Sequence, residues 1–478
     1  MNIMRALCGT WWGADPNTLH NIYKSLIRTH LDYGCQAISP LSKSNNNKMK
    51  KIQYQALRII TGCMRSTPRT ALLAECAEMS IDYRKIWLTI KYLTKVYSII
   101  DHPIQNIIED LHEYCTLKVN YWKNREEPII IKTYRDFSQY FKQIKKLDNI
   151  PFFVYEYDHQ MHTLDYKNLK LKKGVDNNNE FKYLIEQSYS DYCQIFTDGS
   201  LDPVEEKVGV GVFIPQTNYS YHDSLPKFTQ ICTAEIVAIN KACSYCLINN
   251  IKKAVIFSDS QGALEKITSY KNYKRKDYIT ILTKEMIINS NNNGTCIELA
   301  WIPGHTNILG NENADWLANL GKHFAVTNNI PLDKNDILIA CKTFLNNKWH
   351  HFWENELKNK GKWYSGVQYR FPKKPWFQSF PYFNRNHCST MIRMRTGHCL
   401  TEAHKFKIGV NDSPECECGQ IGDLDHIIFE CEINKIPNID IYYLIAQACN
   451  TPTPINVKLI MMNLTVEGSI ILMNFLNT

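Results

Sequence analysis

The sequence of 478 residues lacks any long uninterrupted hydrophobic run. No stretch approaches the roughly 18 consecutive apolar residues of a transmembrane helix. Residues 1–14 also lack the extended apolar segment of a secretory signal. These absences predict an intracellular protein, nuclear or cytoplasmic, that is not secreted and has no membrane partner.

Cysteine is too dilute for a disulfide-bonded scaffold. The 17 cysteines are spread irregularly over the chain, whereas disulfide frameworks belong to short secreted domains. We expect these thiols to stay reduced and to serve as core residues or metal ligands.

Acidic residues are scarce at the N-terminal end. Residues 1–99 carry 14 Lys and Arg against five Asp and Glu, a local charge of +9, although the whole chain carries only +8. A basic excess confined to one end indicates either a nucleic-acid-binding surface or a solvated helical face. Charge by itself leaves both interpretations open.

The length and the 44% apolar and 21% charged residues suit a soluble multidomain chain. Hydrophobic periodicity predicts a multidomain α+β protein with a helical segment at 1–99, a connector at 100–188, an α/β domain at 189–325 and a mostly helical C-terminal region at 326–478. Asn runs at 45–47, 177–179 and 291–293 are interpreted as loops.

Four acidic residues occupy positions where an α/β domain gathers side chains. Asp198 and Asp259 are each expected to end a strand, Glu235 lies near the start of a helix, and Asp315 is expected in the first turn of another. Clustered carboxylates repel one another unless cations neutralise them, so the set suits two Mg²⁺ or Mn²⁺ ions. The alternative is that they cap turns and helices or lie on the surface.

Five motifs in this region occur in an order that resembles the type 1 ribonuclease H domain. They are Thr197-Asp198-Gly199-Ser200, Thr233-Ala234-Glu235, Ser258-Asp259-Ser260, Trp301-Ile302-Pro303-Gly304-His305 and Gly310-Asn311-Glu312-Asn313-Ala314-Asp315-Trp316-Leu317-Ala318. The resemblance implies a five-stranded mixed sheet and a two-metal nuclease that cuts the RNA strand of RNA/DNA hybrids. It also implies that Asp198, Glu235, Asp259 and Asp315 bind the metals and that His305 handles protons. Residues 271–276 stand where some members carry a longer basic protrusion.

A second cluster has metal-ligand spacing near the C-terminus. Cys416, Cys418, His426 and Cys431 offer three thiolates and an imidazole, which suit tetrahedral Zn²⁺, although coincidence in a Cys-rich chain is the alternative. The segment that includes Met394-Arg395-Thr396-Gly397-His398-Cys399 and Ser413-Pro414-Glu415-Cys416 resembles the Cys/His region of non-LTR retrotransposon polyproteins of the I/jockey-like kind. His398 and Cys399 are alternative ligands.

The basic N-terminal segment resembles another part of the same polyproteins. Tyr23-Lys24-Ser25-Leu26-Ile27-Arg28 and Gln53-Tyr54-Gln55-Ala56-Leu57-Arg58 are similar to the helical thumb that follows the palm in their reverse transcriptases. The likeness implies that Arg58, Arg65 and Arg69 face a nucleic-acid backbone. A polymerase palm needs paired aspartates, and no Asp-Asp pair occurs in the chain.

These observations predict a metal-dependent ribonuclease H within a retrotransposon-derived protein that lacks the polymerase palm. Its expected partners are RNA/DNA hybrids and other nucleic acid, and its expected cofactors are two Mg²⁺ or Mn²⁺ ions and one Zn²⁺. The rival hypothesis is a nucleic-acid-binding retroelement remnant whose catalytic site is unused. The sequence predicts no particular protein partner.

Overall fold

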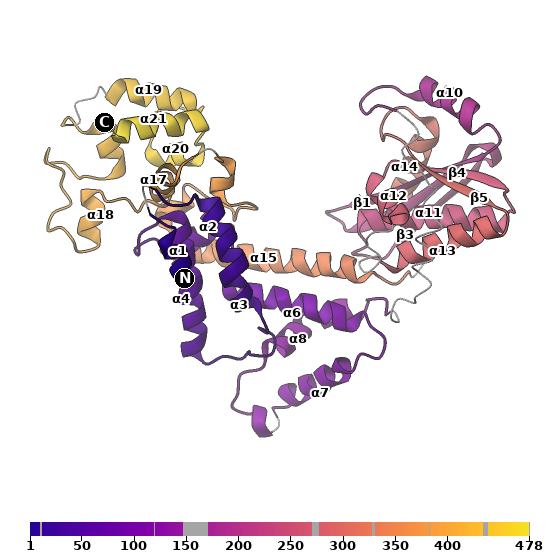
Figure 1. The fold of residues 1–478 in the computed structure, drawn as a ribbon, viewed down its shortest axis with the longest axis horizontal. Coiled ribbons are helices and arrows are strands. Elements are labelled where there is room, and N and C mark those ends of the chain that lie inside the picture. Colours follow the sequence, from indigo (N-terminus) through magenta and orange to yellow (C-terminus); the bar gives the residue numbers. More distant parts are fainter. Residues whose placement is uncertain are drawn as a thin grey trace. The chain divides into compact units, whose positions relative to one another are not determined.

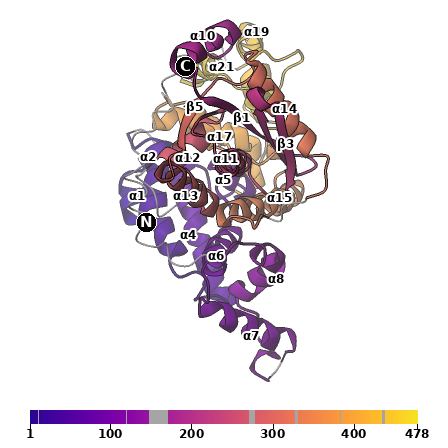
Figure 2. The ribbon, with the colours of Figure 1, turned by 90° about the vertical axis from the view of Figure 1, so that its right-hand side faces the viewer.

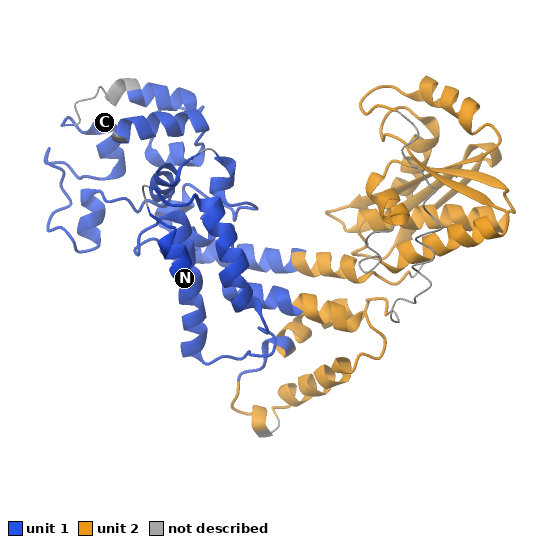
Figure 3. Cartoon of the chain, viewed as in Figure 1, with its two compact units in different colours: residues 1–89, 126–130, 343–478 blue, residues 90–125, 131–342 orange. Residues whose placement is uncertain are grey.

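The computed structural model describes residues 1–9, 12–118, 120–146, 171–269, 277–326, 330–381, 383–433 and 438–477. The basic stretch 271–276 and part of the predicted connector therefore lie outside the described residues. The chain divides into two compact units, the first made of residues 1–89, 126–130 and 343–478 and the second of residues 90–125 and 131–342 (Figure 3).

The second unit contains a mixed sheet of five strands in the order β3-β2-β1-β4-β5 (Figure 1). The strands are β1 (Cys193–Asp202), β2 (Lys207–Ile214), β3 (Tyr219–Leu225), β4 (Lys253–Ser258) and β5 (Cys296–Trp301). Strands β1, β2 and β3 pair antiparallel, whereas β1 pairs parallel with β4 and β4 with β5. Strand β4, which lies between β1 and β5, is a short apolar run because both of its faces are covered. The predicted five-stranded mixed sheet is confirmed.

Helices cover both faces of this sheet, so successive strand residues enter different cores. Ile195 belongs to the cluster shared with α11 (Ile231–Ile248), α12 (Gln261–Thr268) and α13 (Tyr278–Asn292), whereas its neighbour Phe196 packs with α10 (Asn178–Ser188) and α14 (Leu309–Gly321). Helix α14 packs along β1, β2 and β3 (Figure 2). The alternation follows from the two-residue period of a strand.

Among the described helices, only α11 is long and apolar enough to cross a membrane by length and composition. Most of its apolar residues, including Ala234, Ile236 and Ile239, are fully buried in the core beneath the sheet, whereas Ile231 and Ile248 at its two ends are exposed. The hydrophobicity of α11 is therefore accounted for by its place as the central core helix of the second unit.

Most of the predicted connector that the structure describes is helical. It contains α7 (Ile104–Thr116), the 3₁₀ turn η2 (Asn120–Trp122) and α8 (Ile129–Phe141), and it ends in α10. Tyr97, at the end of α6 (Ile81–Tyr97), stacks on Tyr134 and Phe141 of α8. Aromatic packing thus holds these helices together.

The first unit is helical. Its N-terminal helices are α1 (Asn2–Ala6), α2 (Pro16–Ile22), the π-helical η1 (Tyr23–Ile27), α3 (Arg28–Asp32), α4 (Lys43–Thr61), α5 (Arg69–Glu75) and the start of α6. Its C-terminal elements are most of α15 (Lys334–Lys360), then α16 (Lys362–Ser365), η5 (Trp376–Ser379), α17 (Arg385–Thr396), α18 (Glu402–Lys407), the π-helical η6 (His426–Glu430), α19 (Asn438–Ala448), α20 (Val457–Met462) and α21 (Val466–Asn477).

The N- and C-terminal helices of this unit share one core, whereas the sequence-based division placed them in separate segments. A buried polar network joins the two parts: Arg395 Nε donates to Glu75 Oε1 over 2.9 Å, and the hydroxyl of Tyr364 donates to the same oxygen over 2.6 Å. Helical periodicity identifies a buried face but not the helix that covers it, so sequence patterning could not reveal this association.

The expected loops at the Asn runs are wrong at all three places. Asn45–Asn47 lie inside α4, Asn178 and Asn179 begin α10, and Asn291 and Asn292 end α13. Ser42 caps α4 by accepting a hydrogen bond from the Asn45 amide. Asn is unfavourable but tolerated near helix ends, where tertiary packing overrides its weak propensity.

Candidate active site and metal-binding cluster

Two strand-borne carboxylates lie at one edge of the sheet. The parallel pairing of β1 with β4 ends at Thr197 opposite Ser258, so Asp198 and Asp259 are the next residues along their strands. Parallel strands end at the same edge, which brings these side chains together. Asp259 follows β4 as expected, but Asp198 lies inside β1, because that strand continues to Asp202 as the antiparallel partner of β2.

Two helices bring further carboxylates to this edge. Glu235 lies in the second turn of α11, and Asp315 lies in the second turn of α14 rather than in its first. Gly199 permits the approach of α11, since a Cβ atom there would lie 2.8 Å from the backbone nitrogen of Glu235. The β1 backbone can therefore approach α11 closely at Glu235, the residue whose carboxylate reaches the cluster.

The carboxylates converge closely enough to share cations. One ligand atom from each of Asp198, Glu235 and Asp259 lies within 4.8 Å of the others, and a second such group contains His305, Glu312 and Asp315. The carboxylate of Asp315 also lies close enough to that of Asp198 to raise its pKa. The structure therefore gathers all five catalytic residues predicted from sequence.

Burial and mutual repulsion favour the protonated forms of these acids. Burial, followed by the charges of Asp259 and Asp315, raises the pKa of Asp198 to about 8. Burial and the charge of Asp198 raise the pKa of Glu235 well above its ordinary value. Like charges in a poorly solvated site disfavour ionisation, and bound cations would reverse this preference.

Hydrogen bonds hold Asp315 on α14. Asn319 Nδ2 donates to Asp315 Oδ1 over 2.8 Å, and the Ser200 hydroxyl donates to Asn319 Oδ1 over 2.9 Å. This relay connects β1 to the carboxylate on α14. Ser200 and Asn319 thereby orient Asp315 without themselves entering the carboxylate cluster.

His305 is exposed on the loop between β5 and α14, where its backbone has a positive φ of 55°. The neighbouring Asn307 also has a positive φ, of 59°. The segment before α10 braces this loop: the Asn177 amide donates to the Thr306 carbonyl over 3.1 Å, and Asn307 Nδ2 donates to Asp176 Oδ2 over 3.2 Å. The exposed imidazole is thus carried on a loop held at several points.

Sequence reasoning missed Glu312 and Asn311. Glu312 lies three residues before Asp315, so helical spacing could have placed both side chains on the same face of α14. Asn311 hydrogen-bonds to Asp259 and opposes the rise in its pKa, which burial causes. The local sequence around Asn311 gives no sign of this role. Only its burial in the folded structure distinguishes it from other asparagine residues on helices.

Comparison with known proteins identifies this part of the chain. Residues 190–323 match the family described as RNase H. These residues form an RNase H domain. Over 143 residues the chain is 30% identical to human Ribonuclease H1, a match that covers 27% of this chain and 50% of that protein. The rat and mouse Ribonuclease H1 proteins each match at 30% identity over 139 residues, with 27% of this chain and 49% of each relative covered. The chain thus spans about half the length of these curated relatives.

The side chains of the RNase H domain fit divalent cations. The donors are carboxylate oxygens, which suit hard ions such as Mg²⁺ and Mn²⁺. One oxygen of Glu235, Oε2, is buried and has no hydrogen-bond partner in the described structure. A buried polar atom of this kind is costly unless something else satisfies it, and a cation would do so.

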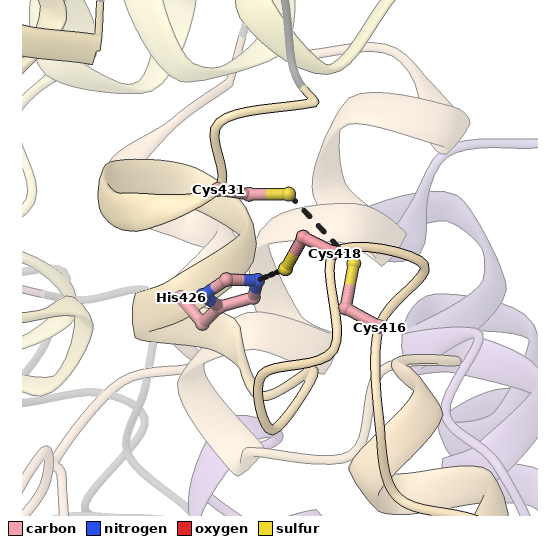
Figure 4. A group of neighbouring side chains, drawn as sticks. All are labelled: Cys416, Cys418, His426 and Cys431. Atoms are coloured by element: carbon pink, nitrogen blue, oxygen red, sulfur yellow. Dashed lines mark hydrogen bonds between the residues drawn. The ribbon is translucent and has the colours of Figure 1, made fainter.

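The structure also brings together the predicted Cys/His set in the first unit, where the four side chains point toward one another (Figure 4). Cys416 Sγ lies 3.7 Å from Cys431 Sγ, and Cys418 Sγ lies 3.1 Å from His426 Nε2. Gly419, at a positive φ of 85°, turns the chain after the paired cysteines, and its amide donates to the Cys416 carbonyl. The alternative ligands His398 and Cys399 are not in this group, and His398 Nδ1 instead lies 3.0 Å from the Ser66 hydroxyl.

The three predicted nucleic-acid-binding arginines lie together in the same unit. Arg58, Arg65 and Arg69 all line one cavity beside α4 and α5. Their contact with nucleic acid stays a prediction.

Proposed function

We propose that this protein is a ribonuclease H, a metal-dependent endonuclease that hydrolyses the RNA strand of RNA/DNA hybrids. The observation that carries the proposal is the convergence of Asp198, Glu235 and Asp259, whose oxygens lie within 4.8 Å of one another. The likeness of residues 190–323 to the RNase H family supports it. The rival hypothesis, a nucleic-acid-binding remnant that no longer cuts, predicts no hydrolysis despite the same side chains.

Each residue of the candidate active site would have a role that follows from the chemistry of its side chain. Asp198, Glu235, Asp259 and Asp315 would hold two Mg²⁺ or Mn²⁺ ions, which activate water and neutralise charge on a phosphodiester in such sites. Asn319 and Ser200 keep Asp315 oriented through their hydrogen bonds. The exposed imidazole of His305 would accept and release protons near the reacting phosphate, since an imidazole ring carries both a proton acceptor and a proton donor.

A cleavage assay tests this function. Asp198→Asn keeps the shape of the side chain but removes a charged ligand, so hydrolysis of a labelled RNA/DNA hybrid with Mg²⁺ or Mn²⁺ should fall by several orders of magnitude. Asp202→Asn, at the end of the same strand, is the matched control and should cut normally. His305→Ala should slow the reaction by only about 10²- to 10⁴-fold.

Chelation and substrate choice complete the test. EDTA should abolish hydrolysis by the wild-type protein, and the same RNA as a single strand or in an RNA duplex should be spared. Cleavage by Asp198→Asn at the wild-type rate would refute the catalytic assignment. A folded wild-type protein that leaves the hybrid intact with either metal would instead support the binding-remnant hypothesis.

The Cys/His cluster supports a second part of the proposal, one structural Zn²⁺ held by Cys416, Cys418, His426 and Cys431. Tetrahedral ligation at about 2.3 Å places neighbouring sulfurs nearly 4 Å apart, and the Cys416 and Cys431 sulfurs are 3.7 Å apart. Together with the basic helices of the first unit, this cluster is why we also propose a retroelement origin of the non-LTR kind.

Metal analysis tests the zinc site. Protein purified without chelators should contain about one Zn²⁺ per chain, and Cys416→Ser or Cys431→Ser should lower that content and destabilise the surrounding turns. Cys296→Ser, which changes an exposed cysteine of the other unit, is the control and should leave the zinc content unchanged. Zinc-free wild-type protein would leave the four side chains as core residues.

A further inference from the structure

A basic cavity of about 570 Å³ lies in the first unit, between the helix α4, the following loop and α5 on one side and α15 on the other. Five cationic residues contribute to its lining, against two acidic ones, Asp82 and Glu356. The cations are Lys50, Arg58, Arg65, Arg69 and Lys360. The excess of positive charge makes an anion the natural occupant.

The cationic side chains of this cavity differ in whether they already have partners within the protein. Lys50 is paired with Asp82 over 2.6 Å, and Arg58 donates to the carbonyls of Met64 and Arg65, each over 3.3 Å, so it holds the loop after α4. Arg65 and Arg69 are exposed and form no ion pair within the described part of the chain. These two guanidinium groups remain available to a ligand.

Aromatic rings form another part of the cavity wall. Phe352 is 44% exposed and packs against Tyr83, whose ring centroid is 5.4 Å away. Tyr54 lies beneath the guanidinium of Arg69, at 5.1 Å. Trp349 also lines the cavity, and its indole nitrogen is buried without a hydrogen-bond partner in the described structure. Phe352 is therefore the exposed ring among these three, and an exposed ring beside cations is the combination that binds an unpaired nucleobase and its phosphate.

A second hollow of about 600 Å³ continues the basic surface. It shares Arg58 and Arg65 with the first cavity, adds Arg5 and Arg385, and has no acidic residue in its lining. A single small anion would occupy one hollow, whereas a polymer with regularly spaced phosphates can extend across both. The shared arginines therefore favour a strand over a mononucleotide.

We infer that the two hollows bind a single strand of nucleic acid, with phosphates at Arg65 and Arg69 and a base stacked on Phe352. A duplex is disfavoured because its bases are already stacked inside the helix and only its backbone could reach the rings. The inference goes beyond the proposed hydrolysis and does not depend on it, since the lining residues belong to the first unit and the carboxylates to the second.

Fluorescence anisotropy on the full-length chain tests the site. Asp198→Asn protein without added Mg²⁺ serves as the background, so that no hydrolysis intervenes. Labelled single strands of RNA and of DNA are each compared with a duplex of the same sequence over a range of salt concentrations. Both single strands should bind more tightly than their duplexes.

Variants then locate the contacts. Arg65→Ala/Arg69→Ala should weaken single-strand binding at least tenfold and reduce the slope of log affinity against log salt by about 1.4, the value expected for two lost phosphate contacts. Lys51→Ala/Lys358→Ala removes the same charge from exposed positions that do not line either hollow and is the matched control. Phe352→Ala should cost about tenfold or more, and Phe352→Trp should restore binding.

The outcomes separate this inference from the proposed hydrolysis. Equal affinity for duplex and single strand, or an equal loss in the arginine variant and its control, would overturn it even if the hybrid is cleaved. Selective single-strand binding that depends on Arg65, Arg69 and Phe352 would support it even if the hybrid is not cleaved.

Discussion

The burial and mutual repulsion of the clustered carboxylates lead to a measurable prediction about the stability of the RNase H domain. In the absence of divalent ions, Asp198→Asn should stabilise the RNase H domain while removing its activity. Because the pKa of Asp198 is raised from 3.8 to about 8, the folded state binds more protons than the unfolded state between those values. Stability therefore falls as the pH rises from about 4 to about 8, and the full penalty is present above pH 8.

The size of the effect follows from this pKa. At about 1.4 kcal/mol per unit, the penalty has an upper limit of roughly 6 kcal/mol. Asparagine removes the charge but still buries a polar amide, which carries its own desolvation cost. We expect the variant to be more stable than the wild type by about 1–3 kcal/mol at pH 8, with almost no difference at pH 4.

Hydrogen exchange of peptides from β1 measures this stability difference within the second unit alone. A global unfolding curve would instead combine the unfolding of both units. In EDTA at pH 8, the amides of residues 193–202 should exchange roughly 5- to 150-fold more slowly in Asp198→Asn than in the wild type. Comparing the two proteins at each pH cancels the intrinsic effect of pH on exchange.

Asp202→Asn is the control on the same strand. Backbone amides of Glu205 and Val204 lower the pKa of Asp202, so its charge carries no comparable penalty and the variant should not be stabilised. Two results would refute the reasoning: unchanged protection in Asp198→Asn at pH 8, or an equal gain at pH 4 and pH 8, because the second outcome would point to packing rather than charge.

Two further expectations concern positioning and stability. Asn177 Nδ2 donates to the Lys172 and Val175 carbonyls, so Asn177→Ala should loosen the brace of the His305 loop and lower the hydrolysis rate about 2- to 10-fold with little change in KM. The exposed Asn179→Ala should have no effect, and adding His305→Ala should remove the dependence on Asn177 if the brace acts through the imidazole. Arg395→Met leaves the buried carboxylate of Glu75 uncompensated and should cost about 3–5 kcal/mol in denaturant unfolding of the first unit. Unchanged stability would show that the pair is dispensable.

The sequence correctly indicated which side chains gather at the edge of the sheet, although it misjudged some of their local settings. Asp198 was expected to end a strand, but the β1 backbone continues because β2 supplies an antiparallel partner beyond the parallel pairing. Glu312 was overlooked, although its three-residue spacing from Asp315 places both side chains on one face of α14. The approach of His305 to within 4.8 Å of these two side chains depends on the conformation of the loop before α14.

The sequence by itself determined the α/β class of the RNase H domain, its carboxylates and the Cys/His spacing, because these features depend on short sequence patterns and on residue chemistry. The tertiary structure alone decided that the N- and C-terminal helices share a core and that Arg58, Arg65 and Arg69 surround a cavity partly walled by α15. The apolar face of an amphipathic helix does not specify which other helix will cover it, because hydrophobic burial is non-directional. Residues almost 300 positions apart become neighbours only when packing selects one arrangement of those helices.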